Sequence, residues 1–165
     1  SGRNQVVLEI GSLTIGSYTY KIYDYLRRDL DGKLRPIHTY HANNVLRRDF
    51  REDWLKANLV QQPRTIREGD GFSEVIVGEH DLLYFSLRNV IFNNKYEDET
   101  TDRFHVLVLV DGENCLIRSL KDPSKSFSQN YLDIVIIPAG FGPYEVINRG
   151  VGVVTMHKTL LKEGY

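Results

Sequence analysis

The stretch FHVLVLVDGENCLIRS, residues 104–119, decides the fold class of this protein. Two runs of β-branched and other apolar residues flank Asp111-Gly112, a dipeptide typical of turns. Similar short runs, separated by turn-forming residues, recur in both directions from this turn. The strands that we expect are residues 64–68, 73–77, 82–91, 104–110, 114–120, 132–137, 144–148 and 151–157. This rhythm predicts a mainly β fold, a jelly-roll or β-sandwich barrel.

One polar segment, residues 93–102, interrupts this series. It contains four carboxylates that form no recognisable acid/base pair, namely Glu97, Asp98, Glu99 and Asp102. We interpret them as the solvated tip of a hairpin, because clusters of charge usually face water. No role in function is expected for them.

The residues before this series carry a helical pattern instead. Leu46, Phe50 and Trp54 recur every four residues, with charged residues on the opposite face, which predicts one amphipathic helix. Gln61-Gln62-Pro63 ends this helix, because proline disfavours a helical residue before it. We expect two parts of the chain, residues 1–60 and residues 61–165.

The first apolar run, Val6 to Ile10, has the composition of a strand, yet no earlier element is available to pair with it. An unpaired strand presents free backbone groups along its edge. We therefore expect this strand to be exposed, or to support self-association by pairing with a second copy.

Composition argues against several classes of protein. The 165 residues carry a formal net charge of −1, whereas nucleic-acid-binding proteins are usually basic. No apolar run approaches the ~20 residues of a membrane span, and no secretory signal is visible. The single cysteine, Cys115, cannot form an internal disulfide and lies in an apolar run. We expect it to be a buried, inert thiol and the protein to be cytoplasmic.

A basic, tyrosine-rich segment, YTYKIYDYLRRDLDGKLRPIHTYH, spans residues 18–41. Its first residues alternate like those of a strand, with Lys21 and Tyr23 on the polar face, and Asp31-Gly32 predicts a turn. Eight basic and four acidic residues between Lys21 and Arg51 give a local charge of +4, which indicates a small anionic ligand. The alternative is a solvated loop whose basic residues pair with the local aspartates.

This segment resembles the stretch that follows the last metal-ligand histidine in class I mannose-6-phosphate isomerases, zinc-dependent members of the cupin superfamily. The family has an aromatic–basic pair, a YDY motif, an arginine, an acidic residue, a glycine turn and an R-x-LH motif. The corresponding residues here are Tyr20-Lys21, Tyr23-Asp24-Tyr25, Arg27, Asp29, Gly32 and Arg35-Pro36-Ile37-His38. The sequence departs from the family at Lys21, where an active-site arginine is usual.

The resemblance implies the C-terminal part of an isomerase that interconverts mannose 6-phosphate and fructose 6-phosphate. Residues 1–60 would be the tail of the catalytic, metal-binding domain, and residues 61–165 a degenerate cupin-type barrel without a catalytic role. Lys21 would act in catalysis, and Arg27 and Arg35 would bind the sugar phosphate. Zinc and its ligands would come from an upstream catalytic domain, the expected partner. This chain alone would then bind no metal and show no isomerase activity.

The spacing of Lys21 and Arg27 sets a condition on this interpretation. Six residues of straight strand span ~20 Å, too far for one sugar phosphate. The chain must bend between the two residues, or only one of them reaches the ligand. The alternative function is a non-enzymatic module, in which a cupin-type barrel binds a sugar or serves as a scaffold.

Two stretches of the expected barrel resemble degenerate cupin metal motifs. Pro138-Ala139-Gly140-Phe141-Gly142 is followed by Pro143 where the family has a ligand histidine, and strand 104–110 offers His105 alone in place of His-x-His. A metal shell of three protein groups is not expected there, so we expect His105 to be a hydrogen-bonded core or strand residue. His38 and His41 lie three residues apart but lack acidic partners nearby, and the sequence assigns them no role.

Overall fold

The computed structural model describes residues 7–11, 20–81 and 83–164. The chain divides into two compact units, Ser1–Trp54 and Leu55–Tyr165, which we call the first unit and the barrel. None of the helices in these described ranges is long and apolar enough to cross a membrane.

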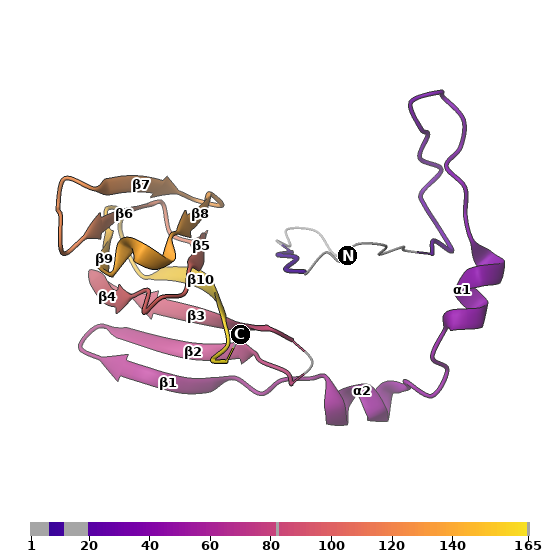
Figure 1. Ribbon diagram of the computed structural model, residues 1–165, viewed down its shortest axis with the longest axis horizontal. Helices are drawn as coiled ribbons and strands as arrows, with labels where there is room; N and C mark the ends of the chain where they lie inside the picture. The colour runs from indigo at the N-terminus through magenta and orange to yellow at the C-terminus, as the bar shows by residue number, and fades with distance from the viewer. Residues whose placement is uncertain (1–6, 12–19, 82, 165) are drawn as a thin grey trace. The chain divides into compact units, whose positions relative to one another are not determined.

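The barrel is a jelly-roll sandwich of two antiparallel sheets (Figure 1). The larger sheet has the strand order β1 (Arg64–Gly69), β2 (Phe72–Gly78), β3 (Phe85–Phe92), β10 (Val154–Leu161), β5 (His105–Asp111) and β8 (Ile134–Ile137). The smaller sheet has the order β4 (Lys95–Glu99), β9 (Pro143–Asn148), β6 (Asn114–Ser119) and β7 (Ser126–Asn130). A short 3-10 helix, η1 (Ala139–Phe141), precedes β9. The mainly β, jelly-roll fold expected from the sequence is confirmed.

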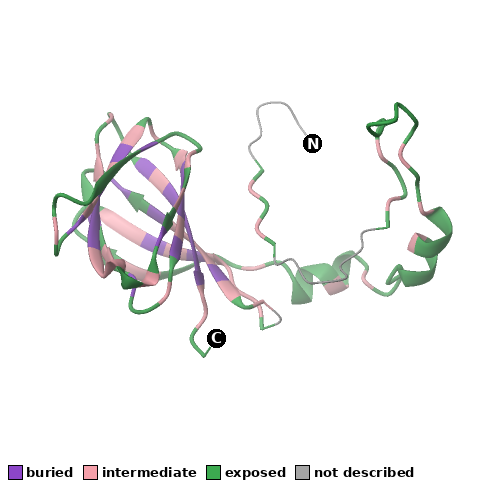
Figure 2. Cartoon of the chain, turned by 45° about the horizontal axis from the view of Figure 1, so that its top comes forward, coloured by how far each residue is buried: buried purple, intermediate pink, exposed green. Residues whose placement is uncertain are grey.

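The apolar core lies between the two sheets, where the buried residues gather in Figure 2. Alternate residues of a strand point to one face, so Val154 and Met156 of β10 both face the core. Leu109 of β5 lies opposite Met156, and Tyr96 and Val146 contribute from the smaller sheet. Burial of one such side chain stabilises the fold by about 1.5–3 kcal/mol. The core thereby holds together strands that also carry charged side chains.

Two strands of the smaller sheet differ from the sequence-based expectation. β4 lies within residues 93–102, so the interpretation of this segment as a hairpin tip is wrong. β7, with the sequence SFSQN, lies where no strand is expected. Both are edge strands, each hydrogen-bonded to one neighbour, and polar residues suit a strand with an open edge. The position of β4 is set by its pairing with β9, and that of β7 by its pairing with β6, because neither strand has an apolar pattern of its own.

The expected single helix is two short ones, α1 (Thr39–Val45) and α2 (Glu52–Asn58). The chain leaves α1 at Leu46, whose backbone is extended, and turns where the Phe50 amide donates to the Arg47 carbonyl oxygen. Asn and Val, which favour helix weakly, occupy the end of α1. Phe50 still stacks on Trp54, with ring centroids 3.7 Å apart. The apolar pattern therefore predicts the contact between Phe50 and Trp54, but not the division of the helix into α1 and α2.

The described part of the basic segment, residues 20–41, forms a hairpin-like loop without regular strands. A bridge joins Arg28 and Leu34 around Gly32, whose φ of +77° confirms the expected turn. Residues 20–23 and 7–10 are not strands, so both strand predictions are wrong over these residues, while Val6 and Tyr18 lie outside the described residues. Apolar alternation forms a strand only where a neighbouring strand takes up its backbone hydrogen bonds.

Candidate functional site

Asp24 joins two of the three basic residues that the resemblance indicates. Its Oδ2 atom lies 3.0 Å from Nε of Arg35 and 3.6 Å from Nζ of Lys21. The Asp24 side chain is 12% exposed, so its attraction for both cations is stronger than between fully exposed charges. The structure thus brings Lys21 and Arg35 together on one carboxylate.

A tight turn bends the chain between Lys21 and Arg27. Tyr25 and Leu26 both have positive φ angles, 51° and 54°, and the Arg27 amide donates to the Asp24 carbonyl oxygen at 2.9 Å. Positive φ is uncommon for residues other than glycine and costs on the order of 1–3 kcal/mol for each such residue. This bend meets the condition that the six-residue spacing imposes.

Arg27 and Arg35 line one cavity of ≈ 340 Å³. The Arg35 amide donates to the Arg27 carbonyl oxygen at 3.0 Å, which holds the two residues together across the loop. The remaining walls are formed by Tyr23, Asp24, Leu26, Leu34, Pro36 and Ile37. The exposed surface of these walls is mostly apolar. Two arginines beside such a cavity supply the side-chain type that binds phosphate or carboxylate groups.

The two histidines of this segment contact Lys21 and Tyr20. The Lys21 amide donates to Nδ1 of His38 at 3.3 Å, and the His38 amide donates to the Lys21 carbonyl oxygen at 2.6 Å. The ring of Tyr20 stacks on His41 with centroids 5.4 Å apart. His38 therefore fixes the backbone of Lys21. Within the part of the chain that the structure describes, no three His, Cys, Asp or Glu side chains are grouped to hold a metal ion.

A cluster of buried charges lies inside the barrel. The Nζ atom of Lys158 on β10 lies 2.5 Å from Oε1 of Glu74 on β2 and 2.6 Å from Oδ2 of Asp98 on β4. Lys158 and Glu74 are only 1% and 2% exposed. Burial alone would raise the pKa of both carboxyls, but the Lys158 ammonium outweighs burial and holds each pKa below its usual value. The carboxylates are therefore charged at neutral pH.

Two arginines extend this cluster. Nη1 of Arg88 lies 3.1 Å from Oε1 of Glu74, and Nε of Arg67 lies 3.2 Å from Oε2 of the same carboxylate. Nη1 of Arg67 also lies 3.6 Å from Oδ1 of Asp98. The cluster sets two carboxylates against three cations, so each carboxylate has more than one charged partner.

His105 and Tyr144 connect to the same cluster. Nδ1 of His105 lies 2.8 Å from the Tyr144 hydroxyl, which donates to Oδ2 of Asp98 at 3.3 Å. Because that hydroxyl has one proton, Nδ1–H of His105 donates to Tyr144. Burial lowers the pKa of His105 to about 4, so the imidazole is neutral at pH 7. The expectation that His105 is a hydrogen-bonded core residue is confirmed.

The sequence analysis missed this cluster, although two signals of it exist. Lys158 continues the inward row of Val154 and Met156 on β10, and Asp98 shares its face of β4 with the buried Tyr96. The solvated interpretation is therefore wrong for Asp98, whose side chain is 10% exposed. The paired charges act as fixed internal contacts between the two sheets.

Cys115, on strand β6 of the smaller sheet, faces the core. Its side chain is fully buried, and burial raises the pKa of the thiol to about 11. A thiol with such a pKa is a poor nucleophile at neutral pH because the thiolate form is scarce. The expectation of a buried, inert thiol is confirmed.

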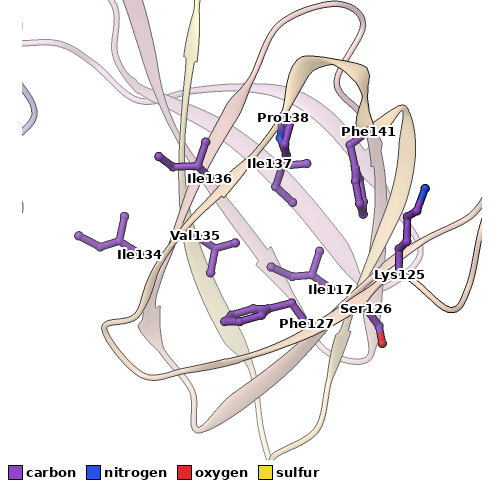
Figure 3. A pocket seen from close by; sticks show the side chains of 10 residues that line it. All are labelled: Ile117, Lys125, Ser126, Phe127, Ile134, Val135, Ile136, Ile137, Pro138 and Phe141. Carbon is purple, nitrogen blue, oxygen red and sulfur yellow. The ribbon is translucent and has the colours of Figure 1, made fainter.

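A separate, apolar pocket of ≈ 490 Å³ opens between β7 and β8 (Figure 3). Ile117 and Ile137 are buried residues of its lining, and Phe127 forms part of the wall. Pro138 and Phe141, from the stretch that resembles a degenerate metal motif, line the same pocket. The polar side chains among the lining residues are Lys125 and Ser126.

Comparison with known proteins supports the fold. No protein-family model matches the chain, and no curated protein matches it. The mannose 6-phosphate isomerase of Bacillus subtilis is similar in structure, with a TM-score of 0.61 and 20% sequence identity over 85% of this chain. A cupin-2 domain protein of Rhodospirillum rubrum matches 62% of the chain and 70% of its own at 12% identity and a TM-score of 0.49. Vicilin of Corylus avellana matches 62% of this chain and 30% of its own length, at 21% sequence identity and a TM-score of 0.49.

The similarity to the Bacillus subtilis isomerase supports the jelly-roll barrel fold, and this chain spans 39% of the length of that isomerase. At 20% sequence identity the similarity concerns the fold alone.

Proposed function

We propose that this chain is the C-terminal part of a sugar-phosphate isomerase that interconverts mannose 6-phosphate and fructose 6-phosphate. One observation carries the proposal. The similarity to the Bacillus subtilis isomerase covers 85% of the chain, whereas the barrel, Leu55–Tyr165, is about two thirds of it. The similarity therefore includes part of the first unit, which contains Lys21, Arg27 and Arg35.

An aldose–ketose isomerase moves a proton between neighbouring carbons and must stabilise negative charge on the enediol oxygen. It must also hold the phosphate. Lys21, oriented by Asp24 and His38, is the residue that we assign to the developing charge. Arg27 and Arg35, at one cavity, are assigned to the substrate phosphate.

The resemblance implies zinc for the whole enzyme, and the residues of this chain that the structure describes do not suit it. The described residues provide no group of three metal-ligating side chains, so zinc would be bound by the upstream catalytic domain. What this chain contributes is positive charge at the substrate and a barrel whose inner charges are paired with one another.

The proposal is tested first by binding to the chain itself. Calorimetric titration with mannose 6-phosphate should give saturable binding, and the neutral sugar mannose should bind at least about tenfold more weakly, since the arginines recognise the phosphate. Arg27→Ala and Arg35→Ala should each weaken binding. Lys33→Ala, an exposed basic residue of the same loop, is the matched control and should leave binding unchanged. Equal binding to both sugars would favour the non-enzymatic sugar-binding module.

In a complete enzyme that contains this chain, the roles separate kinetically. Lys21→Ala should lower kcat roughly 100-fold, the scale of losing one donor at developing negative charge. Arg27→Ala should raise KM and leave kcat nearly unchanged, as for a contact equally strong in ground and transition states. Wild-type kcat/KM for Lys21→Ala would reject its catalytic role. Isomerase activity of this chain alone would contradict the proposal that the upstream domain is required.

A further inference from the structure

The pocket in Figure 3 exists because two consecutive strands, β7 and β8, join different sheets. Near their connecting turn they stay together, since Nε2 of Gln129 donates to the Asp133 carbonyl oxygen at 2.8 Å and the Asn130 amide donates to Oδ2 of Asp133. Away from this turn, β7 pairs with β6 and β8 pairs with β5. The edges of the two sheets therefore diverge and leave a gap.

This gap exposes large apolar side chains around a concave surface. Phe127, 55% exposed, points towards Val135, and Ile117 and Ile137 are buried beside them (Figure 3). Ile134 and Ile136 belong to the same strand, but their side chains point to its other face. The volume of ≈ 490 Å³ lies within the range of small-molecule sites, about 300–1,000 Å³. An apolar occupant would be stabilised by removing these side chains from water.

The pocket is positively charged at one end. Lys125 lines it, and Nζ of Lys121 lies against Gly142, the residue after Phe141. The nearby acidic residue, Asp122, lies 3.5 Å from Nζ of Lys125. Both partners of this pair are exposed, so the pair contributes little and a ligand anion can replace it. Lys121, Lys125 and Asp122 together give this end of the pocket a charge of +1.

We propose that this pocket binds a small amphipathic anion, with an aliphatic or aromatic body between β7 and β8 and a carboxylate, sulfonate or phosphate at Lys125. The apolar walls would contact the body of such a ligand, and Lys125 would pair with its anionic group. The site lies in the barrel and uses none of the residues assigned to the sugar phosphate, so it goes beyond the proposed isomerase function.

The test uses the full chain and the fluorescent probe 1-anilinonaphthalene-8-sulfonate, which has an aromatic body and one sulfonate. We expect saturable binding of one probe per chain, with amide NMR shifts at Phe127, Ile136 and Phe141. Octanoate should displace the probe at least about tenfold better than neutral 1-octanol, because only octanoate pairs with Lys125.

Two variants and two controls locate the site. Phe127→Glu places an acid in the exposed wall, and Lys125→Glu reverses the charge at the cationic end; each should weaken probe binding by about tenfold or more. Val151→Glu is the matched control for an exposed apolar residue of the barrel, and Lys33→Glu for charge reversal. Both controls should keep wild-type binding, with folding verified by thermal unfolding.

Four results would overturn the proposal. Probe binding that is insensitive to Phe127→Glu and Lys125→Glu would place the probe elsewhere, as would NMR shifts confined to the first unit. Equal displacement by octanoate and octanol would remove the anionic requirement. Sedimentation showing a dimer that Phe127→Glu dissociates, without probe binding to either form, would assign the surface to a second copy. Loss of sugar-phosphate binding leaves the proposal intact, because that site uses different residues.

Discussion

The barrel and the first unit both contain many large apolar side chains, but they bury them differently. Every buried residue among the described ones lies in the barrel, and none lies in residues 7–11 or 20–54 (Figure 2). In the barrel, two sheets cover each other. Helix α1 of the first unit has seven residues and buries none of their side chains. Helix α2, which crosses the boundary between the units at Trp54, also has seven residues and buries none. An apolar pattern produces a core only where a second element covers it.

The barrel also buries charge, and the largest expected effect tests this. Lys158→Ala should lower the free energy of unfolding of the barrel by about 3–5 kcal/mol, because Glu74 and Asp98 would remain buried without their shared cation. Chemical denaturation followed by circular dichroism measures the change.

The matched control for Lys158→Ala is Lys33→Ala, whose exposed ion pair with Asp31 should contribute less than about 1 kcal/mol. The triple variant Lys158→Met, Glu74→Gln, Asp98→Asn should recover part of the lost stability, since it removes the buried carboxylates and leaves only Arg67 and Arg88, whose side chains reach solvent. Equal stability of Lys158→Ala and the wild type would show that the cluster is hydrated rather than closed.

The next largest effect tests the core packing of the barrel. Leu107→Ala should destabilise the barrel by about 2–5 kcal/mol, because Leu107 is fully buried between the sheets and truncation leaves a cavity. Denaturation midpoints at constant m-value would report this. A loss below about 1 kcal/mol would mean that the sheets close over the gap.

Acid should destabilise the barrel through His105. The unfolded chain binds a proton at His105 below pH 6.5, whereas the folded barrel binds it only below about pH 4, so stability falls as the pH decreases through this window. The full effect is about 3 kcal/mol, reached near pH 4. Denaturation at a series of pH values measures the slope.

His105→Gln should flatten this slope in part, because glutamine can still bond Tyr144 but does not titrate in the window. A residual slope is expected from His157, since burial lowers its pKa too. Below this window, protonation of Glu74 and Asp98 adds a further loss, because their folded pKa values are lowered. An unchanged slope in His105→Gln would contradict the neutral, buried imidazole.

The smallest effect is expected in the first unit. Phe50→Ala removes the stack on Trp54, yet should change the unfolding of the barrel by less than about 0.5 kcal/mol, because Phe50 lies in the other unit. Tryptophan fluorescence would report the local change, since Trp54 is the single tryptophan. Destabilisation comparable to Leu107→Ala would show that the two units unfold together.

The sequence was most informative where strands are apolar. Strands β5 and β6, on either side of the Asp111-Gly112 turn, are predicted from the sequence because both lie between neighbours and contain runs of Val, Leu or Ile. That these two strands join different sheets was not predictable from this pattern. The polar edge strands β4 and β7 have no such pattern. In the basic segment, the turn at Gly32 was predicted, whereas the convergence of Lys21 and Arg35 on Asp24 required the folded loop.

By itself, the sequence determined the mainly β character, the turns and the basic character of residues 18–41, because alternation and turn chemistry are local properties. Tertiary structure alone decided that Lys158 lies inside. A lysine on a strand favours water unless carboxylates meet it, and Glu74 and Asp98 reach it from strands β2 and β4. The pocket beside β8 likewise depends on which sheet each strand joins. Burial and pairing depend on neighbours that are distant in sequence, so local pattern does not specify them.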